Sequence, residues 1–506
     1  MKNFLKRNKD TVIGRNVRKT RYFWHVFSGK VEDIRDDAEE MLEHAIIRTQ
    51  RVTERIKLLN FIKLLTVLCV IYVFVFTIIS RGTKTGLVVV NDAMEVEVVT
   101  TGFTILGLNL IYILWQLFLT LRYKPFENET DEKLPTCTVI VPAYNEGKQV
   151  YQTLKSILKS DYPAEKFSIY TINDGSTDDT LVWMNKAAKE ANGKIIVIDL
   201  KENQGKRNAI YQGVSKSKSE VFVTVDSDTE LLPLTLRNLV SPFVADDKIG
   251  GVAGNIRVLN LNEGLIPHML DVSFVYGFEF TRTAQSRIRT VFCTPGALSA
   301  YRRDLLEPLL PGWVNEKFLG RPANIGEDRG LANLILANGY DIVFQRDAIV
   351  FTAVPSTYKA LCRMLIRWAR TNFRENFAML RYAFKRYTWN WIGLQINWVM
   401  QFIWMFTPTI FIFTAFYSIT KDAMAFFYST VTFITLSSTV PAFFYACRYS
   451  KNESLWSYVY GLYSFFALFW IAPYALLTIR QSGWLTRGPG NEPTAKKKKK
   501  KRTKKK

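Results

Sequence analysis

One short stretch decides the fold of this chain: Val221-Phe222-Val223-Thr224-Val225-Asp226-Ser227-Asp228-Thr229-Glu230. Its apolar, β-branched first half is typical of a buried strand, and the run ends in two carboxylates one residue apart. Ligands of open α/β sheets bind at the carboxyl ends of the strands, so Asp226 and Asp228 are expected at the mouth of a cleft. Paired carboxylates suit Mg²⁺ or Mn²⁺ shared with a substrate's phosphates. A plain turn is the alternative, because Asp and Ser are common in turns.

Outward from this strand, short apolar segments alternate with polar segments of helical length. Strands are predicted at 138–142, 168–173, 195–200 and 221–225, and helices at 151–160, 180–191 and 207–216. This alternation predicts a parallel sheet wound with helices. We therefore expect an α/β domain over residues 122–375.

Long apolar segments flank this domain on both sides. Hydrophobic residues make up 48% of the 506 residues, and five segments are long enough to cross the hydrocarbon core of a bilayer. They lie at 58–80 and 98–121 before the domain, and at 395–419, 423–447 and 455–479 after it. The α/β domain is therefore expected to be inserted between α-helical transmembrane segments.

The distribution of charge predicts the orientation in the membrane. The formal net charge is +22, and much of it lies at the two ends of the chain. Basic clusters beside membrane spans stay on the cytosolic side and attract anionic lipid. Five spans would separate the two ends, so one segment is expected to be re-entrant, split or interfacial near Pro408 or Pro473. We expect a multi-pass plasma-membrane protein with a cytosolic domain.

These patterns divide the chain into six regions: a basic cytosolic N-terminal region (1–57), two transmembrane helices (58–121), the α/β domain (122–375), an interface helix region (376–394), C-terminal transmembrane helices (395–480) and a cytosolic segment with a lysine-rich tail (481–506). Residues 31–57 have the periodicity of an amphipathic helix, at the membrane surface or in solution. Five scattered cysteines offer no zinc or disulfide spacing. No nucleic-acid-binding module accompanies the basic ends, so no nucleic-acid partner is expected.

Three further loops carry side chains suited to a nucleoside diphosphate. After the first strand, Ala143-Tyr144-Asn145-Glu146 offers an aromatic face for a base and a carboxylate acceptor. Asp174 ends the second strand and can accept a hydrogen bond from a uracil ring or a ribose. Lys206 opens a helix behind a glycine, and a basic helix N-terminus favours an anionic diphosphate. Turn and helix-capping roles are the alternatives for these loops.

Three downstream motifs also carry chemistry. Glu327-Asp328-Arg329 precedes a predicted helix and supplies a carboxylate that could deprotonate a sugar hydroxyl. Arg367-Trp368 pairs a phosphate ligand with a flat surface for a sugar ring. Trp484-Leu485-Thr486-Arg487 follows the last apolar segment, where an arginine could close over a diphosphate. A helix cap and interfacial Trp-Arg anchors are the simpler alternatives.

In their order along the chain, these motifs resemble those of the family 2 membrane glycosyltransferases, which include cellulose, chitin and hyaluronan synthases. The shared motifs are Pro-Ala-Tyr-Asn-Glu, Asp-Gly-Ser, Gly-Lys-Arg, Asp-x-Asp, Glu-Asp-Arg and Arg-Trp. Similarity to the hyaluronan synthase branch is carried by 254–260, 284–286, 296–302, 373–375 and 482–487. The resemblance covers residues 135–490. Met364 stands where the family has a glutamine three residues before the arginine of the Arg-Trp pair, so that acceptor-site group is replaced here.

The resemblance implies a GT-A-type domain and a processive, inverting polysaccharide synthase of the hexosyltransferase class. Its donors would be UDP-sugars, and its acceptor would be a growing polysaccharide that leaves through the membrane helices of the same chain. The favoured interpretation is a hyaluronan synthase. Mannuronan, chitin-like and glucan synthases and a non-processive lipid-linked sugar transferase are the alternatives.

The resemblance also implies roles for individual residues. The uridine would be held by Ala143, Tyr144, Glu146 and Asp174. The diphosphate would be contacted by Lys206, Arg367, Trp484, Thr486 and Arg487. Asp228, helped by Asp226, would ligate Mg²⁺ or Mn²⁺. Asp328 would be the general base, tuned by Glu327 and Arg329. Trp368 would form the floor of the acceptor site, and Cys293 would contact the growing sugar or act as a small buried hydrophobe.

Overall fold

The computed structural model describes residues 60–61, 63–68, 71–72, 75 and 93–481. The chain divides into two compact units, residues 1–62 and 63–506, and the elements described below belong to the second. The predicted amphipathic helix at 31–57, much of the predicted span at 58–80 and the motif at 484–487 lie outside the described residues.

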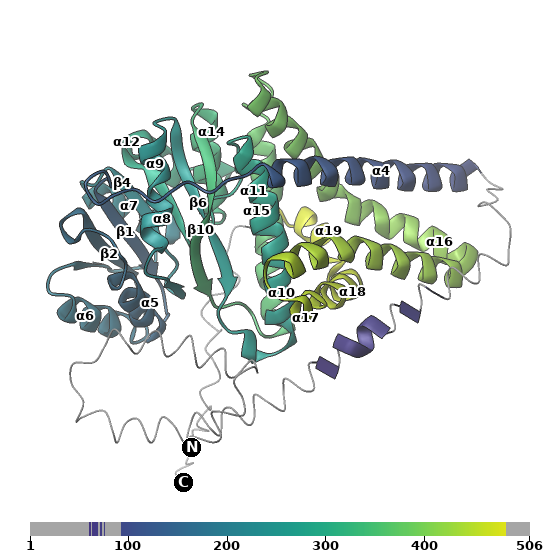
Figure 1. Cartoon of the computed structure of the whole chain (residues 1–506), viewed down its shortest axis with the longest axis horizontal. Coiled ribbons are helices and arrows are strands. Elements are labelled where there is room, and N and C mark those ends of the chain that lie inside the picture. Colours follow the sequence, from purple (N-terminus) through teal and green to yellow (C-terminus); the bar gives the residue numbers. More distant parts are fainter. Residues whose placement is uncertain (1–59, 62, 69–70, 73–74, 76–92, 482–506) are drawn as a thin grey trace, which may run out of the picture. The chain divides into compact units, whose positions relative to one another are not determined.

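An eight-stranded sheet forms the centre of the α/β domain (Figure 1), in the strand order β3-β2-β1-β4-β7-β6-β10-β5. Its strands are β1 (Cys137–Ala143), β2 (Phe167–Asp174), β3 (Ile195–Leu200), β4 (Val221–Thr224), β5 (Thr229–Leu231), β6 (Ile249–Val258), β7 (Ser299–Arg302) and β10 (Asp341–Thr352). Strands β1 to β4 pair with one another in parallel. The chain connects them through helices α5 (Gln149–Leu158), α6 (Thr180–Glu190) and α7 (Lys206–Lys216). This half of the sheet confirms the predicted alternation of strands and helices.

The other half of the sheet departs from the all-parallel expectation. Strand β7 runs antiparallel to both β4 and β6, and β5 runs antiparallel to β10. The first residue of β7, Ser299, pairs with the last residue of β4, Thr224. The chain therefore enters β7 at the carboxyl edge of the sheet and has to run in the reverse direction. The result is a mixed sheet in which parallel pairs dominate.

Burial explains why the central strands read as continuous apolar runs. Both β1 and β4 are buried along their whole length, as is usual where helices cover both faces of a parallel sheet. The smaller elements around them are α8 (Thr235–Val240), α9 (Pro242–Ala245), α12 (Arg303–Leu306), α13 (Leu310–Val314) and the two-stranded pair β8 (Lys317–Phe318) and β9 (Arg321–Pro322).

Four helices and one π-helix carry side chains toward the carboxyl ends of β2 and β4. They are α10 (Leu265–Phe274), the π-helix η3 (Val275–Phe280), α11 (Thr281–Arg287), α14 (Glu327–Ala337) and α15 (Tyr358–Met379). The π-helix continues α10 directly into α11. Short π-helical segments widen a helix locally and are frequent at functional sites.

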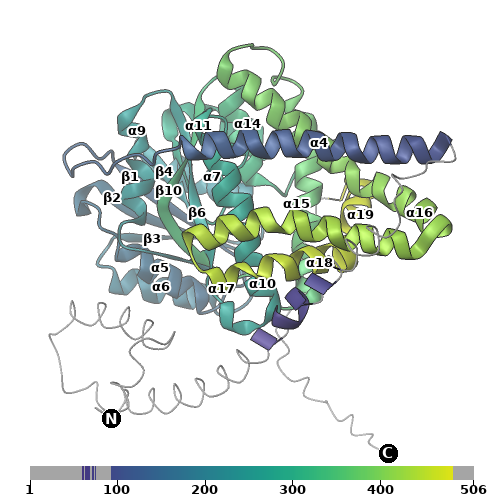
Figure 2. The same ribbon diagram turned by 45° about the vertical axis from the view of Figure 1, so that its right-hand side comes forward.

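Long apolar helices follow and precede the domain, and in Figures 1 and 2 they extend to the same side of the sheet. They are α4 (Ala93–Leu121), α16 (Trp389–Arg448), α18 (Trp456–Leu468) and α19 (Ile471–Leu477), with α17 (Lys451–Ser454) between. Trp389–Met424 and Phe426–Arg448 are each long and apolar enough to cross a membrane, and the pair Lys451–Leu468 and Ile471–Leu477, bent by 45°, is a third candidate among the described residues. This bend lies just before Pro473, one of the two positions where a split segment was expected.

Candidate active site

A cavity of about 1070 Å³ opens at the carboxyl ends of β2 and β4 and continues between the helices. It brings together most of the residues singled out in the sequence: Ala143, Tyr144, Asp174, Lys206, Asp226, Asp228, Glu327, Asp328, Arg329, Arg367 and Trp368. At its far end it is lined by Gln116 of α4, Trp404 and Met405 of α16 and Ala472 of α19. The same cavity therefore reaches from the sheet edge to the apolar helices.

Glu146 is placed differently from its neighbours in the loop after β1. It is not among the residues that line this cavity, and its backbone N–H donates to the Thr180 hydroxyl over 2.8 Å. The next N–H, of Gly147, donates to the same hydroxyl over 2.9 Å. This loop is thus held against the start of α6. Trp484, Thr486 and Arg487 lie outside the described residues.

Asp174 organises the loop that leads into α7. Its two carboxylate oxygens accept from the backbone N–H groups of Gln204 and Gly205, over 2.8 and 3.0 Å. Burial raises the pKa of this carboxyl group, and the two N–H donors offset part of that rise. Gly175 follows in a left-handed conformation (φ 67°), where a Cβ would come within 2.5 Å of the Glu202 backbone. The sequence therefore needs glycine for this turn.

Lys206 lies at the start of α7 between two carboxylates. Its Nζ is 2.5 Å from Oδ1 of Asp226 and 2.5 Å from Oε1 of Glu327. Burial by itself would lower the pKa of Lys206, but the two carboxylates outweigh it and raise the pKa above its ordinary value. Gly296 lies against this trio, since a Cβ there would be 2.6 Å from Nζ. The cluster connects the Asp-x-Asp motif to the start of α14.

The Asp-x-Asp motif fits a divalent metal shared with phosphates. Asp228 Oδ1 accepts from the Thr352 hydroxyl over 3.3 Å, and both motif carboxylates line the cavity. No group of three or more His, Cys, Asp or Glu side chains arranged for a metal is found in the part of the chain that the structure describes. Mg²⁺ is commonly held by one or two carboxylates together with substrate phosphates. A pair of carboxylates beside a lysine is suited to that arrangement.

Asp328 and Glu327 open α14 with opposite shifts in pKa. Burial raises the pKa of Asp328, and the negative charge of Glu327 raises it further. Burial also acts on Glu327, but the charge of Lys206 outweighs it and lowers the pKa of Glu327. The Cys293 thiol donates to Asp328 Oδ2 over 3.4 Å. A cavity-lining carboxylate with a raised pKa has the property required of a general base.

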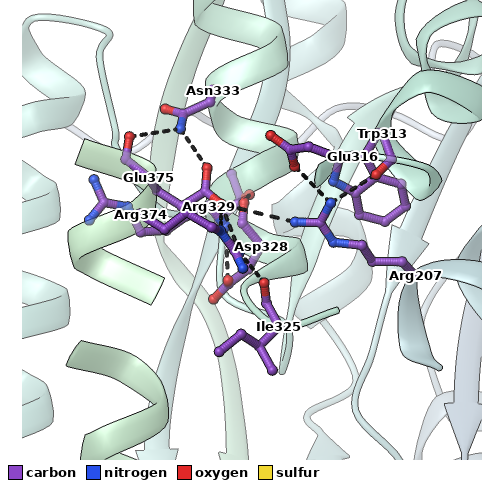
Figure 3. Close-up of polar contacts among 10 residues, drawn as sticks. Arg207, Trp313, Glu316, Ile325, Asp328, Arg329, Asn333, Arg374 and Glu375 are labelled. Atoms are coloured by element: carbon purple, nitrogen blue, oxygen red, sulfur yellow. Dashed lines mark hydrogen bonds and ion pairs between the residues drawn. The ribbon is translucent and has the colours of Figure 1, made fainter. Parts of the chain in front are cut away.

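A buried network of ion pairs and hydrogen bonds connects the start of α14 to α15 (Figure 3). Arg374 of α15 donates to the Ile325 carbonyl and pairs with Glu375 at 2.8 Å. Asn333 of α14 donates to the other Glu375 oxygen over 2.8 Å. Burial raises the pKa of Glu375, against the lowering effect of Arg374. The network fixes α14 against α15 and so determines where Asp328 lies.

Arg207 joins the same network from α7. Its Nη1 donates to the Trp313 carbonyl and to Glu316, over 2.8 Å each, and Nη2 lies 4.0 Å from Glu375 (Figure 3). The helix that begins with Lys206 is therefore connected through Arg207 to the support of Asp328.

The end of the cavity toward the apolar helices is lined by aromatic rings and amides. The Trp368 ring lies 5.9 Å from that of Phe274 and 6.2 Å from that of Phe278, measured between centroids. The Arg329 guanidinium donates to the side-chain oxygens of Asn372 and Asn376, over 2.9 Å each. Arg329 thus contacts α15, whereas only its backbone N–H bonds the Asp328 carboxylate.

Several lining residues were absent from the sequence prediction: Phe274, Phe278, Arg282, Asn372 and Gln401. Asn372 could have been found, because it follows Trp368 by four residues on one helix and so shares its face. The π-helical segment carries no comparable signal.

Comparison with known proteins agrees with this geometry. Residues 138–310 match the family model described as glycosyl transferase family 2. The mannosyltransferase of Pyrobaculum calidifontis, solved with GDP-mannose and Mn²⁺, is 20% identical, covers 72% of this chain and 98% of its own, and superposes with a TM-score of 0.53. That likeness shows a shared fold.

Curated relatives include enzymes of two kinds. An N-acetylglucosaminyltransferase of Rhizobium meliloti (strain 1021) is 34% identical over 49% of this chain, and the match spans 58% of that relative, just over half its length. That of Rhizobium sp. (strain N33) is 29% identical over 72% of this chain and 80% of its own. The hyaluronan synthase of Streptococcus pyogenes serotype M3 (strain ATCC BAA-595 / MGAS315) is 29% identical over 77% of this chain and 91% of its own.

Fold, site and matches together define a glycosyltransferase of the hexosyltransferase class. Within its α/β part, which has a GT-A-like fold, residues 138–310 match glycosyl transferase family 2, and the chain is related to hyaluronan synthases and to N-acetylglucosaminyltransferases.

Proposed function

We propose that this protein is a processive, inverting polysaccharide synthase that polymerises sugars from UDP-activated donors and exports the chain through its own membrane helices. One observation carries the proposal. A single cavity runs from the strand-end carboxylates, past Asp328, to side chains of α4, α16 and α19. A transferase that adds one sugar to a small acceptor has no need for a site that continues among apolar helices.

The donor is proposed to bind at the sheet edge. Ala143, Tyr144 and Asp174 would border the uridine, with Lys206 and Arg367 near the diphosphate. Asp228 and Asp226 would hold Mg²⁺ or Mn²⁺, whose charge stabilises the UDP leaving group. Because Asp226 is paired with Lys206 at 2.5 Å, the lysine has to turn toward the phosphates as the metal-bound donor enters. Glu146, Trp484, Thr486 and Arg487 remain candidates for donor contacts on the resemblance alone.

Asp328 is proposed to take the proton of the acceptor hydroxyl. The hydroxyl oxygen then forms a bond to the anomeric carbon while the bond to the UDP oxygen breaks. A single displacement inverts the anomeric centre, whereas retention would need a second carboxylate close to that carbon. Trp368 with Phe274 and Phe278 would hold the acceptor ring by stacking. Glu327 would keep Lys206 charged, and Arg329 would fix the helix start against α15.

The product is proposed to be hyaluronan, with a neutral chitin-like chain as the second candidate. The similarity to the streptococcal hyaluronan synthase extends over 77% of this chain, which favours the first. The 34% identity to an N-acetylglucosaminyltransferase over 49% of the chain favours the second. Mannuronan and glucan synthases remain alternatives on the resemblance alone.

The protein is proposed to lie in the plasma membrane with the transferase domain in the cytosol. The apolar helices and the strongly basic composition support this orientation, because basic flanks stay on the cytosolic side. The growing chain would then start at the cytosolic face and leave between the apolar helices.

The test uses purified full-length protein in lipid nanodiscs with radiolabelled donors. UDP-GlcNAc and UDP-GlcA together should give a polymer of high mass, and either donor alone should not. Polymer from UDP-GlcNAc alone would establish the neutral alternative. A product that carries a single added sugar would refute processive synthesis.

A further inference from the structure

Arg282 is a buried cation in the cavity wall with one N–H group that no described residue accepts. It lies on α11, directly after the π-helix, and is only 5% exposed. Its Nη1 has no hydrogen-bond partner among the residues that the structure describes, while the rest of the guanidinium interacts with the Cys293 thiol and, at longer range, with the Asp328 carboxylate. Burial lowers the pKa of this guanidinium. A buried donor without an acceptor is costly, and a ligand that enters the cavity with a carboxylate would supply the acceptor.

The surroundings of Arg282 identify the part of the site that this anion would occupy. Arg282 lines the cavity together with Cys293 and Asp328. Its guanidinium lies 4.2 Å from the centre of the Phe278 ring, which covers one face of the cation. Phe278 in turn lies 6.2 Å from Trp368, between centroids. A sugar ring held by these aromatic side chains would present its substituents to Arg282.

Two other buried arginines show why Arg282 stands apart. Arg374 pairs with Glu375 at 2.8 Å, and Arg329 donates to two asparagine side chains over 2.9 Å each. Their donors are used to hold α14 and α15 together. The exposed fractions of Arg329 and Arg282, 4% and 5%, are almost equal, so the difference lies in their partners and not in their depth.

We propose that Arg282 binds the carboxylate of a hexuronate at the transfer site, which makes the product an acidic polysaccharide. The proposal rests on the proposed synthase function, because it assumes that this wall of the cavity meets a sugar. Guanidinium and carboxylate pair through two parallel N–H···O bonds. A neutral sugar would offer the free N–H of Arg282 only a hydroxyl oxygen, and a hydrogen bond to an uncharged acceptor is weaker.

The first experiment measures acceptor binding to the full-length protein in nanodiscs with UDP present. The probe is a hyaluronan tetrasaccharide with glucuronate at its non-reducing end, compared with the same oligosaccharide after reduction of its carboxyl groups to hydroxymethyl groups. The wild type should bind the acidic form about 10- to 100-fold more tightly, the range of a hydrogen bond to a charged group. Arg282→Gln should remove this preference, and Arg282→Lys should retain part of it. Unchanged UDP affinity shows that each variant is folded.

A second arm distinguishes acceptor from donor as the source of the carboxylate. Affinities for UDP-glucuronate and UDP-glucose are compared in the wild type and in Arg282→Gln. Selective loss of UDP-glucuronate affinity supports a carboxylate on the donor, and selective loss for the oligosaccharide supports one on the acceptor. If Arg282→Gln changes neither preference, the inference is overturned.

Different results would refute the role of Arg282 and the proposed synthase function. A wild type that forms no polymer and releases no UDP from any pair of donors would refute the proposed function. A wild type that forms polymer but binds the acidic and reduced oligosaccharides equally, and whose affinities for UDP-glucuronate and UDP-glucose do not depend on Arg282, would refute only the role of Arg282. Polymerisation of UDP-GlcNAc alone into a neutral chain would also refute the role of Arg282 and leave the synthase function standing.

Discussion

The two ends of the cavity balance charge in different ways. At the sheet edge, Lys206 lies between Asp226 and Glu327, and Asp174 accepts from two peptide N–H groups. Toward the apolar helices, the buried Arg282 keeps one N–H, at Nη1, without an acceptor among the described residues. At the sheet edge, proposed above to bind the donor and called the donor end, the chain itself pairs the charges; at the opposite end, proposed to hold the acceptor and called the acceptor end, one N–H of Arg282 is left for a ligand. Asp328 lies at the boundary between them.

The largest expected effect comes from removing the proposed base, Asp328, at this boundary. Asp328→Asn keeps the size of the side chain but cannot take a proton, so turnover should fall by about 10²- to 10⁴-fold. UDP affinity should stay near that of the wild type, because the paired charges of the donor end are untouched. Single-turnover kinetics and UDP titration measure the two quantities separately. Lost UDP affinity with normal turnover at saturating donor would assign Asp328 to the donor end and move the base to Glu327.

The next effect tests the support behind Asp328. Arg374→Met leaves the Glu375 carboxylate buried without its partner at 2.8 Å, and breaking a buried pair in this way costs about 3–5 kcal/mol of stability. Denaturant unfolding in detergent should show this loss. The double variant Arg374→Met/Glu375→Leu should recover part of it, because an apolar pair carries no uncompensated charge.

A matched control breaks a surface pair instead. Arg303 and Glu307 lie 2.8 Å apart, one helical turn from each other, with both side chains partly exposed. Arg303→Met should change stability by less than about 1 kcal/mol. Equal losses in Arg303→Met and Arg374→Met would contradict a special role for the buried network.

A smaller effect is expected from the metal position at the donor end. Asp228→Asn should lower turnover by about 100-fold, since loss of about 3 kcal/mol of metal stabilisation at about 1.4 kcal/mol per tenfold change in rate gives this factor. Chelation of the wild type should have the same effect and be reversed by Mn²⁺ or Mg²⁺. Mn²⁺ binding in the presence of UDP, followed by electron paramagnetic resonance, should weaken in the variant. Full activity of the wild type in excess chelator would refute the proposed metal at the donor end.

The donor end could be predicted from the sequence because its residues follow strands. Strand ends are readable from apolar runs, and β3 was predicted with the bounds Ile195–Leu200 that the structure has. Parallel strands place their carboxyl ends at one edge, so Asp174, Asp226 and Asp228 had to meet there. The partner of Asp174 could not be predicted, because its hydrogen bonds to Gln204 and Gly205 depend on loop geometry.

The acceptor end could be predicted only where a motif marks it. Trp368 was found through the Arg-Trp pair, but Phe274, Phe278 and Arg282 lie on a run of helix interrupted by a π-helical segment. A π-helix shifts which side chains share a face, so a pattern based on 3.6 residues per turn fails there. The antiparallel strand β7 was missed because four residues carry too little pattern to reveal direction.

The smallest expected effect concerns the hydrogen bond between Cys293 and the base. Burial raises the pKa of the Cys293 thiol to about 12, so at neutral pH it is protonated and donates to Asp328 over 3.4 Å. A donor favours the charged carboxylate. Cys293→Ala should therefore raise the pKa of Asp328 and move the acidic limb of the pH–rate profile to higher pH. Cys293→Ser supplies a stronger donor and should move this limb to lower pH. The shift in Cys293→Ala should be less than about one pH unit, which corresponds to about 1.4 kcal/mol, because a thiol is a weak donor and its distance to Asp328 is 3.4 Å. Shifts of the same sign in both variants would show that the thiol acts on the acceptor end by packing and not through the base.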